Sequence, residues 1–221
     1  MLEGIIQGKR ISARRTLLYG THGIGKSTWA AAAPKPLVLA TEDGLDDVGC
    51  DRTPLLSKTI DVAQWLTALG GEDHECQTVV IDTLDWLEKL IWQATCEEAG
   101  KKSIEDFGFG KGYVIAVRRW EKLLQMLDVC RNNGINVVLL SHAKIEKFSP
   151  PDSDPYDRWV PDLHKQASAL VQEWCDEVLF ATYQVSTIKH DEGYGQSRTR
   201  AIGNADRVVF TSEAPTHAGK R

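Results

Sequence analysis

The residues most clearly able to do chemistry lie in the segment 20–27, which reads Gly-Thr-His-Gly-Ile-Gly-Lys-Ser and matches the pattern Gly-x-x-x-x-Gly-Lys-Ser/Thr. Glycines let backbone N–H groups curl around a phosphate, and a helix that starts there adds its positive dipole end. The Lys26 ammonium would reach the β- and γ-phosphates, and the Ser27 hydroxyl would bind Mg²⁺. We therefore predict a site for ATP and Mg²⁺ on consecutive residues, namely Gly20, Thr21, His22, Gly23, Ile24, Gly25, Lys26, Ser27 and Thr28.

Acidic residues at the ends of two apolar runs would complete this site. Asp82 ends the apolar run 78–81, which is where a second carboxylate for Mg²⁺ is expected. It could instead cap the next helix, and Asp85 is a competitor that we place on that helix's first turn. Hydrolysis also needs a group that orients and deprotonates water. Glu42, shortly after the run 37–40, is our candidate for that base, and the alternative is an ordinary solvated acidic loop.

The spacing of apolar residues indicates the elements that hold these groups. Short apolar runs alternate with longer segments of helical pattern, which is typical of a parallel sheet buried on both faces. The predicted strands cover 16–19, 37–40, 78–82 and 137–141, and the predicted helices include 62–69, 84–99 and 114–132. After residue 142 we predict a long proline-broken loop over 147–163, a helix over 165–174, and strands over 177–183, 199–202 and 207–211, with a hairpin tip at 190–197. The predicted fold is α/β, a mostly parallel twisted sheet flanked by helices, with antiparallel strands added at the C-terminal end.

Composition narrows the class of protein. The 221 residues suit one domain, with 42% hydrophobic and 26% charged residues. No apolar run approaches the roughly 20 residues of a membrane span, and the N-terminus has no signal-peptide pattern, so we expect a cytoplasmic protein without membrane contact. Five scattered cysteines argue against a disulfide framework or a zinc knuckle. The net charge of −5 provides no global attraction to nucleic acid, so contact with DNA would depend on local cations.

Segments 20–27, 41–44 and 79–82 together resemble the RecA superfamily of P-loop ATPases. The resemblance implies a RecA-like ATPase core in which Glu42 is the catalytic glutamate. It also implies that His142, at the end of the fourth strand, senses the γ-phosphate; a buried, hydrogen-bonded histidine is the alternative.

A closer similarity is to phage-encoded, core-only RecA-like ATPases, including the Sak-type single-strand annealing and recombination proteins. It is carried by Phe109-Gly110-Lys111-Gly112-Tyr113, by Ser141-His142-Ala143-Lys144, and by the segments 155–165 and 173–181. The similarity extends from about Arg15 to Arg221. We therefore expect a single ATPase domain over 1–221, with an N-terminal extension at 1–14 and a C-terminal tail at 214–221.

By position, the segments 107–113 and 146–164 correspond to the two DNA-binding loops of RecA. Single-stranded DNA is bound by cations that contact its phosphates and by aromatic rings that stack on its bases, and these segments contain both. Alternatively, the aromatic rings only anchor these loops to the rest of the protein. The candidate DNA-binding residues are Lys111, Tyr113, Lys147, Phe148, Arg158 and Trp159. The tail residues Lys220 and Arg221 resemble a cation element that acts on a neighbouring subunit's site, with Arg198 and Arg200 as competitors.

The resemblance implies an Mg²⁺-dependent, DNA-stimulated ATPase that acts on single-stranded DNA in phage recombination or annealing, within the host cytoplasm. Expected partners are single-stranded DNA, further copies of the chain in a ring or filament, and a single-strand DNA-binding protein. Two alternatives stay open. One is an ATP-switched DNA- or protein-binding module with negligible turnover, and the other is a motor or loader for phage replication.

Overall fold

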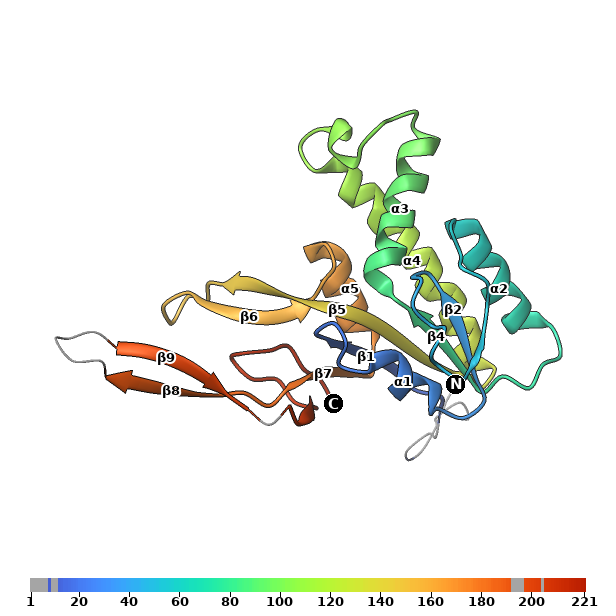
Figure 1. Ribbon diagram of the computed structural model, residues 1–221. Coiled ribbons are helices and arrows are strands. Elements are labelled where there is room, and N and C mark those ends of the chain that lie inside the picture. Colours follow the sequence, from blue (N-terminus) through green and yellow to red (C-terminus); the bar gives the residue numbers. More distant parts are fainter. Residues whose placement is uncertain (1–7, 9–11, 192–196, 204) are drawn as a thin grey trace.

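The main sheet has eight strands, and helices cover both of its faces (Figure 1). The computed structural model describes residue 8 and residues 12–221 except 192–196 and 204, and it describes no side chains within 186–202. The strands are β1 Arg15–Gly20, β2 Pro36–Ala40, β3 Asp51–Arg52, β4 Thr78–Asp82, β5 Asn136–Phe148, β6 Tyr156–Pro161, β7 Glu177–Tyr183, β8 Ser186–Asp191, β9 Ser197–Ile202 and β10 Arg207–Phe210. The helices are α1 Lys26–Ala31, α2 Thr59–Gly71, α3 Leu84–Glu98, α4 Lys111–Asn132 and α5 Lys165–Trp174, with a 3₁₀ turn η2 at Ile104–Phe107.

The strand order β10-β7-β1-β5-β4-β2-β3 confirms the predicted fold class. Every pair from β7 to β3 in this order is parallel. The antiparallel strands come late in the chain, as expected, because β10 pairs with β7, β6 pairs with the end of β5, and β8 and β9 form a separate hairpin. None of the described helices is both long and apolar enough to cross a membrane.

Two apolar layers hold the helices to the sheet. On one face, α2, α3, α4 and α5 pack on alternate residues of the central strands, with Leu17, Val79 and Leu139 among those fully buried. On the other face, Leu18 and Val80 pack with Ala30 of α1. Strands buried on both faces need apolar side chains at every position, which explains the unbroken apolar runs in the sequence.

The predicted loop over 147–163 is wrong. β5 continues to Phe148 and pairs antiparallel with β6, from Ala143 opposite Pro161 to Phe148 opposite Tyr156. The prolines that suggested a loop lie in the turn or at the last residue of β6, where a missing N–H costs no ladder hydrogen bond. The resulting hairpin projects beyond the sheet on the same side as β8 and β9 (Figure 1).

The helical arm formed by α3 and α4 also differs from the prediction at its tip. α4 begins at Lys111, three residues before the predicted start, and η2 and the short strand β3 were not expected. Gly110 precedes the helix with a φ of 69°, a conformation that glycine adopts without strain. Gly112 touches η2 so closely that an added Cβ would lie 2.4 Å from the carbonyl oxygen of Ile104. The glycine-rich stretch is therefore a helix start packed against a tight turn.

Glu88 joins α3 to the segment that follows the β5–β6 hairpin. Its side chain is buried and accepts a hydrogen bond from the His164 backbone N–H at 2.8 Å. Its other oxygen, Oε1, has no hydrogen-bond partner among the described residues. Burial raises the pKa of this carboxyl to about 7, so it is largely neutral below that pH.

We predict that Glu88→Gln stabilises the protein in a pH-dependent manner. The pKa of Glu88 in the folded state, about 7, lies above the ordinary value of glutamate. The stability of the wild-type protein therefore falls as pH rises between these two pKa values, and above pH 7 the whole cost of burying the ionised carboxylate is present. The neutral amide avoids that cost and can still accept from His164. We expect the substitution to raise the free energy of unfolding by up to about 3 kcal/mol above pH 7, and to change it very little near the ordinary pKa of glutamate. Denaturant unfolding across pH, with Glu97→Gln as an exposed control, checks this; equal shifts at all pH values would contradict it.

Candidate active site

The segment 20–27 forms a loop between the end of β1 and the start of α1, as its pattern predicted. Gly23 and Gly25 have φ values of 70° and 97°, in the region that favours glycine. A Cβ on Gly20 would lie 2.3 Å from the carbonyl oxygen of Ala181 on β7, so no side chain fits there. The buried hydroxyl of Thr21 has no partner among the described residues. The loop therefore has the strand–loop–helix setting that phosphate binding requires, with glycines at the two positive-φ positions.

Lys26 lies inside this loop with its ammonium held by the loop's own backbone. Its Nζ donates to the carbonyl oxygens of Gly20 at 3.2 Å and Thr21 at 3.1 Å, and the residue is only 7% exposed. Burial lowers the pKa of this amine, and the nearby carboxylates of Asp82, Asp85 and Glu42 oppose that shift. A cation is therefore fixed beside the curled loop, where an anion would gain most from it.

Asp82 ends β4 next to the first turn of α1. The neighbouring Ser27 hydroxyl lowers the pKa of the buried Asp82 carboxyl, but burial outweighs this and raises the pKa above its ordinary value. A hydroxyl and a carboxylate are oxygen ligands that Mg²⁺ prefers. This pair fits Mg²⁺, which would also favour the ionised form of Asp82.

The backbone of Asp82 positions Glu42. The Asp82 carbonyl oxygen accepts from the backbone N–H groups of Thr41 at 2.8 Å and Glu42 at 3.1 Å. The Thr83 hydroxyl donates to Glu42 Oε2 at 3.1 Å, and Thr83 is in turn held through its carbonyl oxygen by the Thr41 hydroxyl at 2.7 Å. Glu42 is thus a directed carboxylate beside Asp82 rather than a freely solvated loop residue.

His142 is paired with Asp85, a contact that the sequence did not reveal. Asp85 lies on the first turn of α3, as expected, and its two oxygens accept from the His142 backbone N–H at 3.0 Å and from Nδ1 at 2.9 Å. Burial opposes ionisation of Asp85, but these hydrogen bonds outweigh burial and hold its pKa below the ordinary value. The imidazole also stacks on His22 of the phosphate loop, with ring centroids 3.8 Å apart. His142 is therefore both buried and hydrogen-bonded, and it borders the cavity described next.

These groups surround one cavity of about 310 Å³. Its lining residues are Gly23, Gly25, Lys26, Ser27, Thr28, Glu42, Gly44, Leu45, Val48, Asp82, Thr83 and His142. One possible ligand atom from each of Glu42, Asp85 and His142 lies within 4.8 Å of the other two, so these three side chains could also hold a cation. Because both Asp85 oxygens already accept hydrogen bonds from His142, the Ser27–Asp82 pair is the better place for Mg²⁺.

One side chain from β7 and one from β10 contact the phosphate loop, and the sequence analysis predicted neither contact. The Tyr183 hydroxyl donates to the Gly23 carbonyl oxygen at 3.2 Å. The Arg207 guanidinium lies so close to Gly25 that a Cβ there would be 2.9 Å from its Nη1. No motif marks either residue, because their proximity arises from the pairing of β10 with β7.

This geometry agrees with the comparison against protein families. The AAA_24 family, described as an AAA domain, matches residues 12–221. The chain belongs to the AAA_24 family. It is therefore a P-loop nucleoside-triphosphatase by family, with the phosphate loop, Glu42, Asp82 and His142 gathered at one cavity.

A curated relative of this AAA_24 member is protein YorG of the SPbeta prophage in Bacillus subtilis (strain 168), which is 26% identical over 150 residues. The aligned part is 64% of this chain and 45% of the relative, so the chain spans less than half of that protein's length. Among solved structures, the RadB recombinase is 13% identical with a TM-score of 0.49, covering 90% of this chain and 87% of that one. The flagellar accessory protein FlaH from Methanocaldococcus jannaschii is 9% identical with a TM-score of 0.42, covering 90% and 86%.

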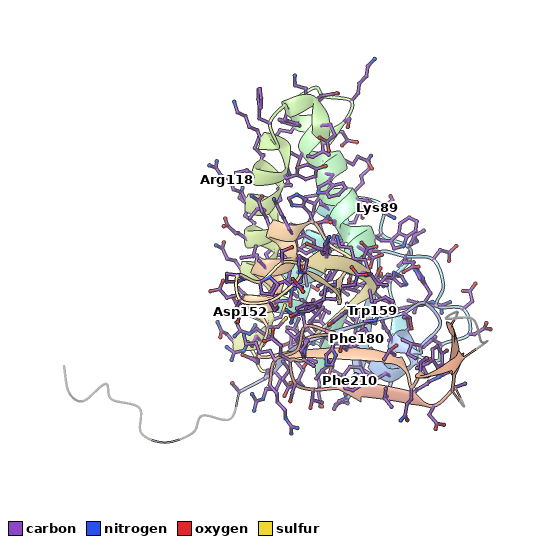
Figure 2. The ribbon with its side chains drawn as sticks, turned by 90° about the vertical axis from the view of Figure 1, so that its left-hand side faces the viewer. Lys89, Arg118, Asp152, Trp159, Phe180 and Phe210 are labelled. Atoms are coloured by element: carbon purple, nitrogen blue, oxygen red, sulfur yellow. The ribbon has the colours of Figure 1, made fainter. Side chains whose placement is uncertain are left out.

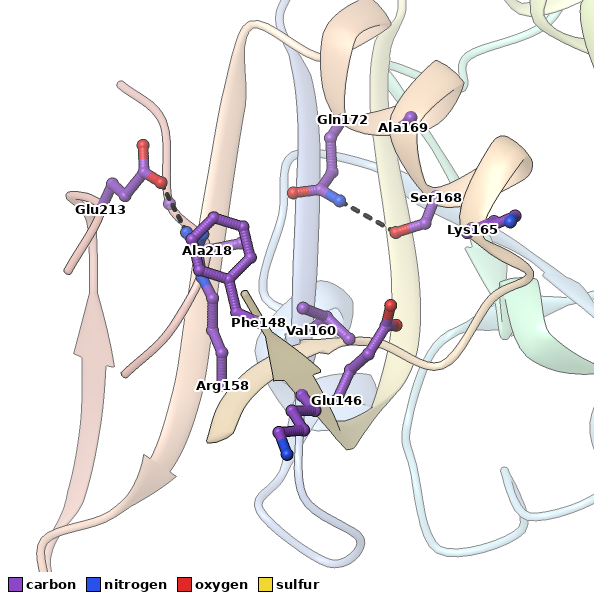
Figure 3. Close-up of a pocket in the computed structure, with 12 residues that line it drawn as sticks. Glu146, Phe148, Arg158, Val160, Lys165, Ser168, Ala169, Gln172, Glu213 and Ala218 are labelled. Atoms are coloured by element: carbon purple, nitrogen blue, oxygen red, sulfur yellow. Dashed lines mark hydrogen bonds and ion pairs between the residues drawn. The ribbon is translucent and has the colours of Figure 1, made fainter. Parts of the chain in front are cut away.

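The second predicted surface, residues 146–164, is largely the β5–β6 hairpin. Lys147 and Phe148 are exposed, whereas Arg158 is half-buried and pairs with Glu213 at 2.6 Å while lying over the Phe148 ring. The hairpin borders a cavity of about 290 Å³, with α5 and the C-terminal tail as its other walls (Figure 3). Trp159 instead points to the body of the protein and stacks on Phe180 (Figure 2).

The first predicted DNA-binding segment, 107–113, lies at the tip of the α3–α4 arm. Phe109 is fully exposed there, and Lys111 is exposed on the first turn of α4. Tyr113 is held in place, because it stacks on His164 with centroids 4.1 Å apart and its hydroxyl donates to Glu105. This contact and Glu88 both connect the arm to the start of α5.

The C-terminal tail packs along the body. Lys220 donates to the carbonyl oxygens of Gln172, Glu173 and Cys175 at the end of α5, so a role in a neighbouring site would require its release from all three. Arg221 is exposed. The side chains of the competitors Arg198 and Arg200 lie outside the described residues, as does most of the N-terminal extension 1–14.

We predict that Asp85→Asn slows ATP hydrolysis by at least about tenfold while changing ATP affinity little. The amide can still accept from the His142 backbone, but it must donate to Nδ1, which moves the ring proton to the opposite nitrogen. Phosphate release and ATP titration of the same preparations separate the two effects. Asp47→Asn, in the exposed acidic loop, is the matched control, and unchanged turnover in Asp85→Asn would remove His142 and Asp85 from the reaction.

Proposed function

We propose that this protein hydrolyses ATP with Mg²⁺ and acts on single-stranded DNA in phage recombination or annealing. The observation that carries the ATPase part is the convergence of Lys26, Asp82, Glu42 and His142 on one cavity beside the glycine loop. A protein that only bound nucleotide would have no need of a directed carboxylate such as Glu42. The site therefore favours turnover over an ATP-driven switch.

Each side chain has a definite task in this proposal. The loop N–H groups and Lys26 bind the phosphates. Ser27 and Asp82 would hold Mg²⁺, which would supply positive charge to offset that of the transferred phosphoryl group. Glu42, aligned by the Thr83 hydroxyl, orients a water and accepts its proton. His142, whose ring Asp85 fixes through Nδ1, borders the cavity as the side chain that senses the γ-phosphate. Because these groups are preorganised, little rearrangement is needed when the reaction begins.

The β5–β6 hairpin is the proposed site for single-stranded DNA. Its exposed Lys147 and Phe148 combine a cation with a ring, and this combination suits a phosphate backbone with unstacked bases. β5 also links the two sites physically, because the same strand carries His142 at the cavity and Phe148 at the hairpin. Nucleotide state can therefore alter hairpin position through one continuous strand.

The proposal extends to assembly and setting. One hairpin on a chain of net charge −5 offers few phosphate contacts, so a ring or filament of copies would strengthen binding by repetition. Arg221 is the accessible cation of the tail for a neighbouring site. The prophage origin of the YorG relative supports a phage origin for this chain. The further parts of the proposal are that the protein is of the Sak type and works in the host cytoplasm alongside a single-strand DNA-binding protein.

Glu42→Gln should bind ATP with Mg²⁺ normally and hydrolyse it about 10²–10⁴-fold more slowly, because the base is lost while the phosphate contacts remain. Asp82→Asn should in addition lose its dependence on Mg²⁺. Lys26→Ala should weaken binding as well as turnover. Calorimetric titration and phosphate release distinguish the three variants, and normal turnover by Glu42→Gln would contradict the assignment of the base.

Hairpin substitutions should weaken DNA binding in two different ways. Phe148→Ala should cost about 1–3 kcal/mol with little change in salt dependence, because it removes stacking. Lys147→Ala should reduce the salt slope by about one phosphate contact. Anisotropy of a labelled oligonucleotide over a salt series measures both, with Lys35→Ala as the control because Lys35 lies just before β2, away from the hairpin. Full affinity in both variants would place DNA elsewhere and favour a protein-directed motor or loader.

A further inference from the structure

A groove runs across the face where α2, α3 and α4 meet, and its volume of about 540 Å³ exceeds that of the nucleotide cavity. Its floor is apolar and comes from all three helices, namely Ile60, Ala63, Ile91, Ile115, Leu123 and Met126. A second hollow of about 360 Å³ shares Thr59, Ile60, Glu98 and Arg119 with it. The two hollows therefore form one elongated depression.

Part of this floor is open to solvent. Ile60 is 57% exposed and Ile115 is 39% exposed, although Ile91 and Leu123 beneath them are buried. Single exposed apolar residues are ordinary on protein surfaces, but two in one groove, from α2 and from α4, give a partner somewhere to bury its own apolar side chains.

The rim of the depression is net cationic although the whole chain is acidic, because Lys58, Arg118, Arg119 and Lys122 line it against Glu97 and Glu98. Arg118 and Lys122 are one helical turn apart on α4, both are exposed, and neither has an ion pair or hydrogen bond within the described part of the chain. Figure 2 shows Arg118 projecting outward from α4. Arg119, in contrast, is neutralised by Glu98. Like charges at this spacing repel each other, so a negative partner here relieves an unfavourable interaction as well as making new ones.

We propose that this groove docks an acidic, amphipathic peptide segment of a partner protein, with apolar side chains on the floor and carboxylates at Arg118 and Lys122. The helix-in-groove mode of recognition fits a surface built from three helices. Single-stranded nucleic acid fits poorly, because none of the described lining residues is aromatic and stacking is what such strands use. The inference does not depend on ATP hydrolysis or on DNA binding by the hairpin.

The test is a selection of short displayed peptides on the full-length protein. Peptides that also bind the double variant Arg118→Glu with Lys122→Glu are removed by counter-selection. The control is the double variant Lys101→Glu with Lys102→Glu, which changes the net charge by the same amount at exposed residues outside the groove. Enriched peptides should be acidic with apolar residues at helical spacing. Their affinity, measured by anisotropy, should fall by roughly tenfold or more in the first variant and in high salt, and should be unchanged in the control.

Two further readouts decide the proposal. Ile60→Ser, which changes the floor without changing charge, should also weaken the selected peptides, and circular dichroism should show that it stays folded. Failure to enrich acidic amphipathic peptides, or equal binding to the reversed-charge variant, would overturn the proposal. If no peptide binds but the double variant changes the oligomeric state by light scattering, the groove is an interface between copies of this chain and the proposal is likewise overturned.

Discussion

The arrangement of the site depends on the register of the parallel strands. Gly20 lies opposite His142 and Ala40 lies opposite Asp82, so β1, β2 and β4 end on the same side of the sheet, where His142 of the longer strand β5 lies beside them. The register is set by apolar side chains buried on both faces, where a slip of one residue would exchange the two faces of a strand. Hydrophobic packing far from the cavity therefore determines which polar residues meet in it.

The polar contacts then orient what the register brings together. The Asp82 carbonyl oxygen fixes the Thr41–Glu42 backbone, Thr83 aligns Glu42, and Asp85 holds the ring of His142. Each of these groups is buried or half-buried, where electrostatic interactions are stronger than in water. Burial also raises the pKa of Asp82 and lowers that of Lys26, which means that it disfavours the charged form of both side chains. The phosphates of a bound nucleotide would stabilise the charged form of Lys26, and the metal would stabilise that of Asp82.

Much of this could be predicted from the sequence, because apolar runs identify buried parallel strands and the glycine loop has a fixed spacing. The fold class, the position of Asp82 at the end of β4 and that of Glu42 just after β2 follow from those two signals. His142 was expected at the end of its strand, whereas β5 continues to Phe148. The β5–β6 hairpin was missed because prolines at its turn concealed the alternation of the strands. The Asp85–His142 pair and the approach of Arg207 to Gly25 leave no local pattern, since they join segments 57 residues apart or more and exist only once the sheet has formed.

The central claim is that this cavity turns ATP over with the help of a bound divalent cation. Steady-state phosphate release by the purified wild-type chain, with Mg²⁺ and after chelation, tests it most directly when ATP binding is measured in the same preparation. The account predicts turnover that requires Mg²⁺ and stops on chelation. Tight ATP binding without phosphate release above the blank, with or without single-stranded DNA, would contradict it and would leave the cavity as an ATP-driven switch.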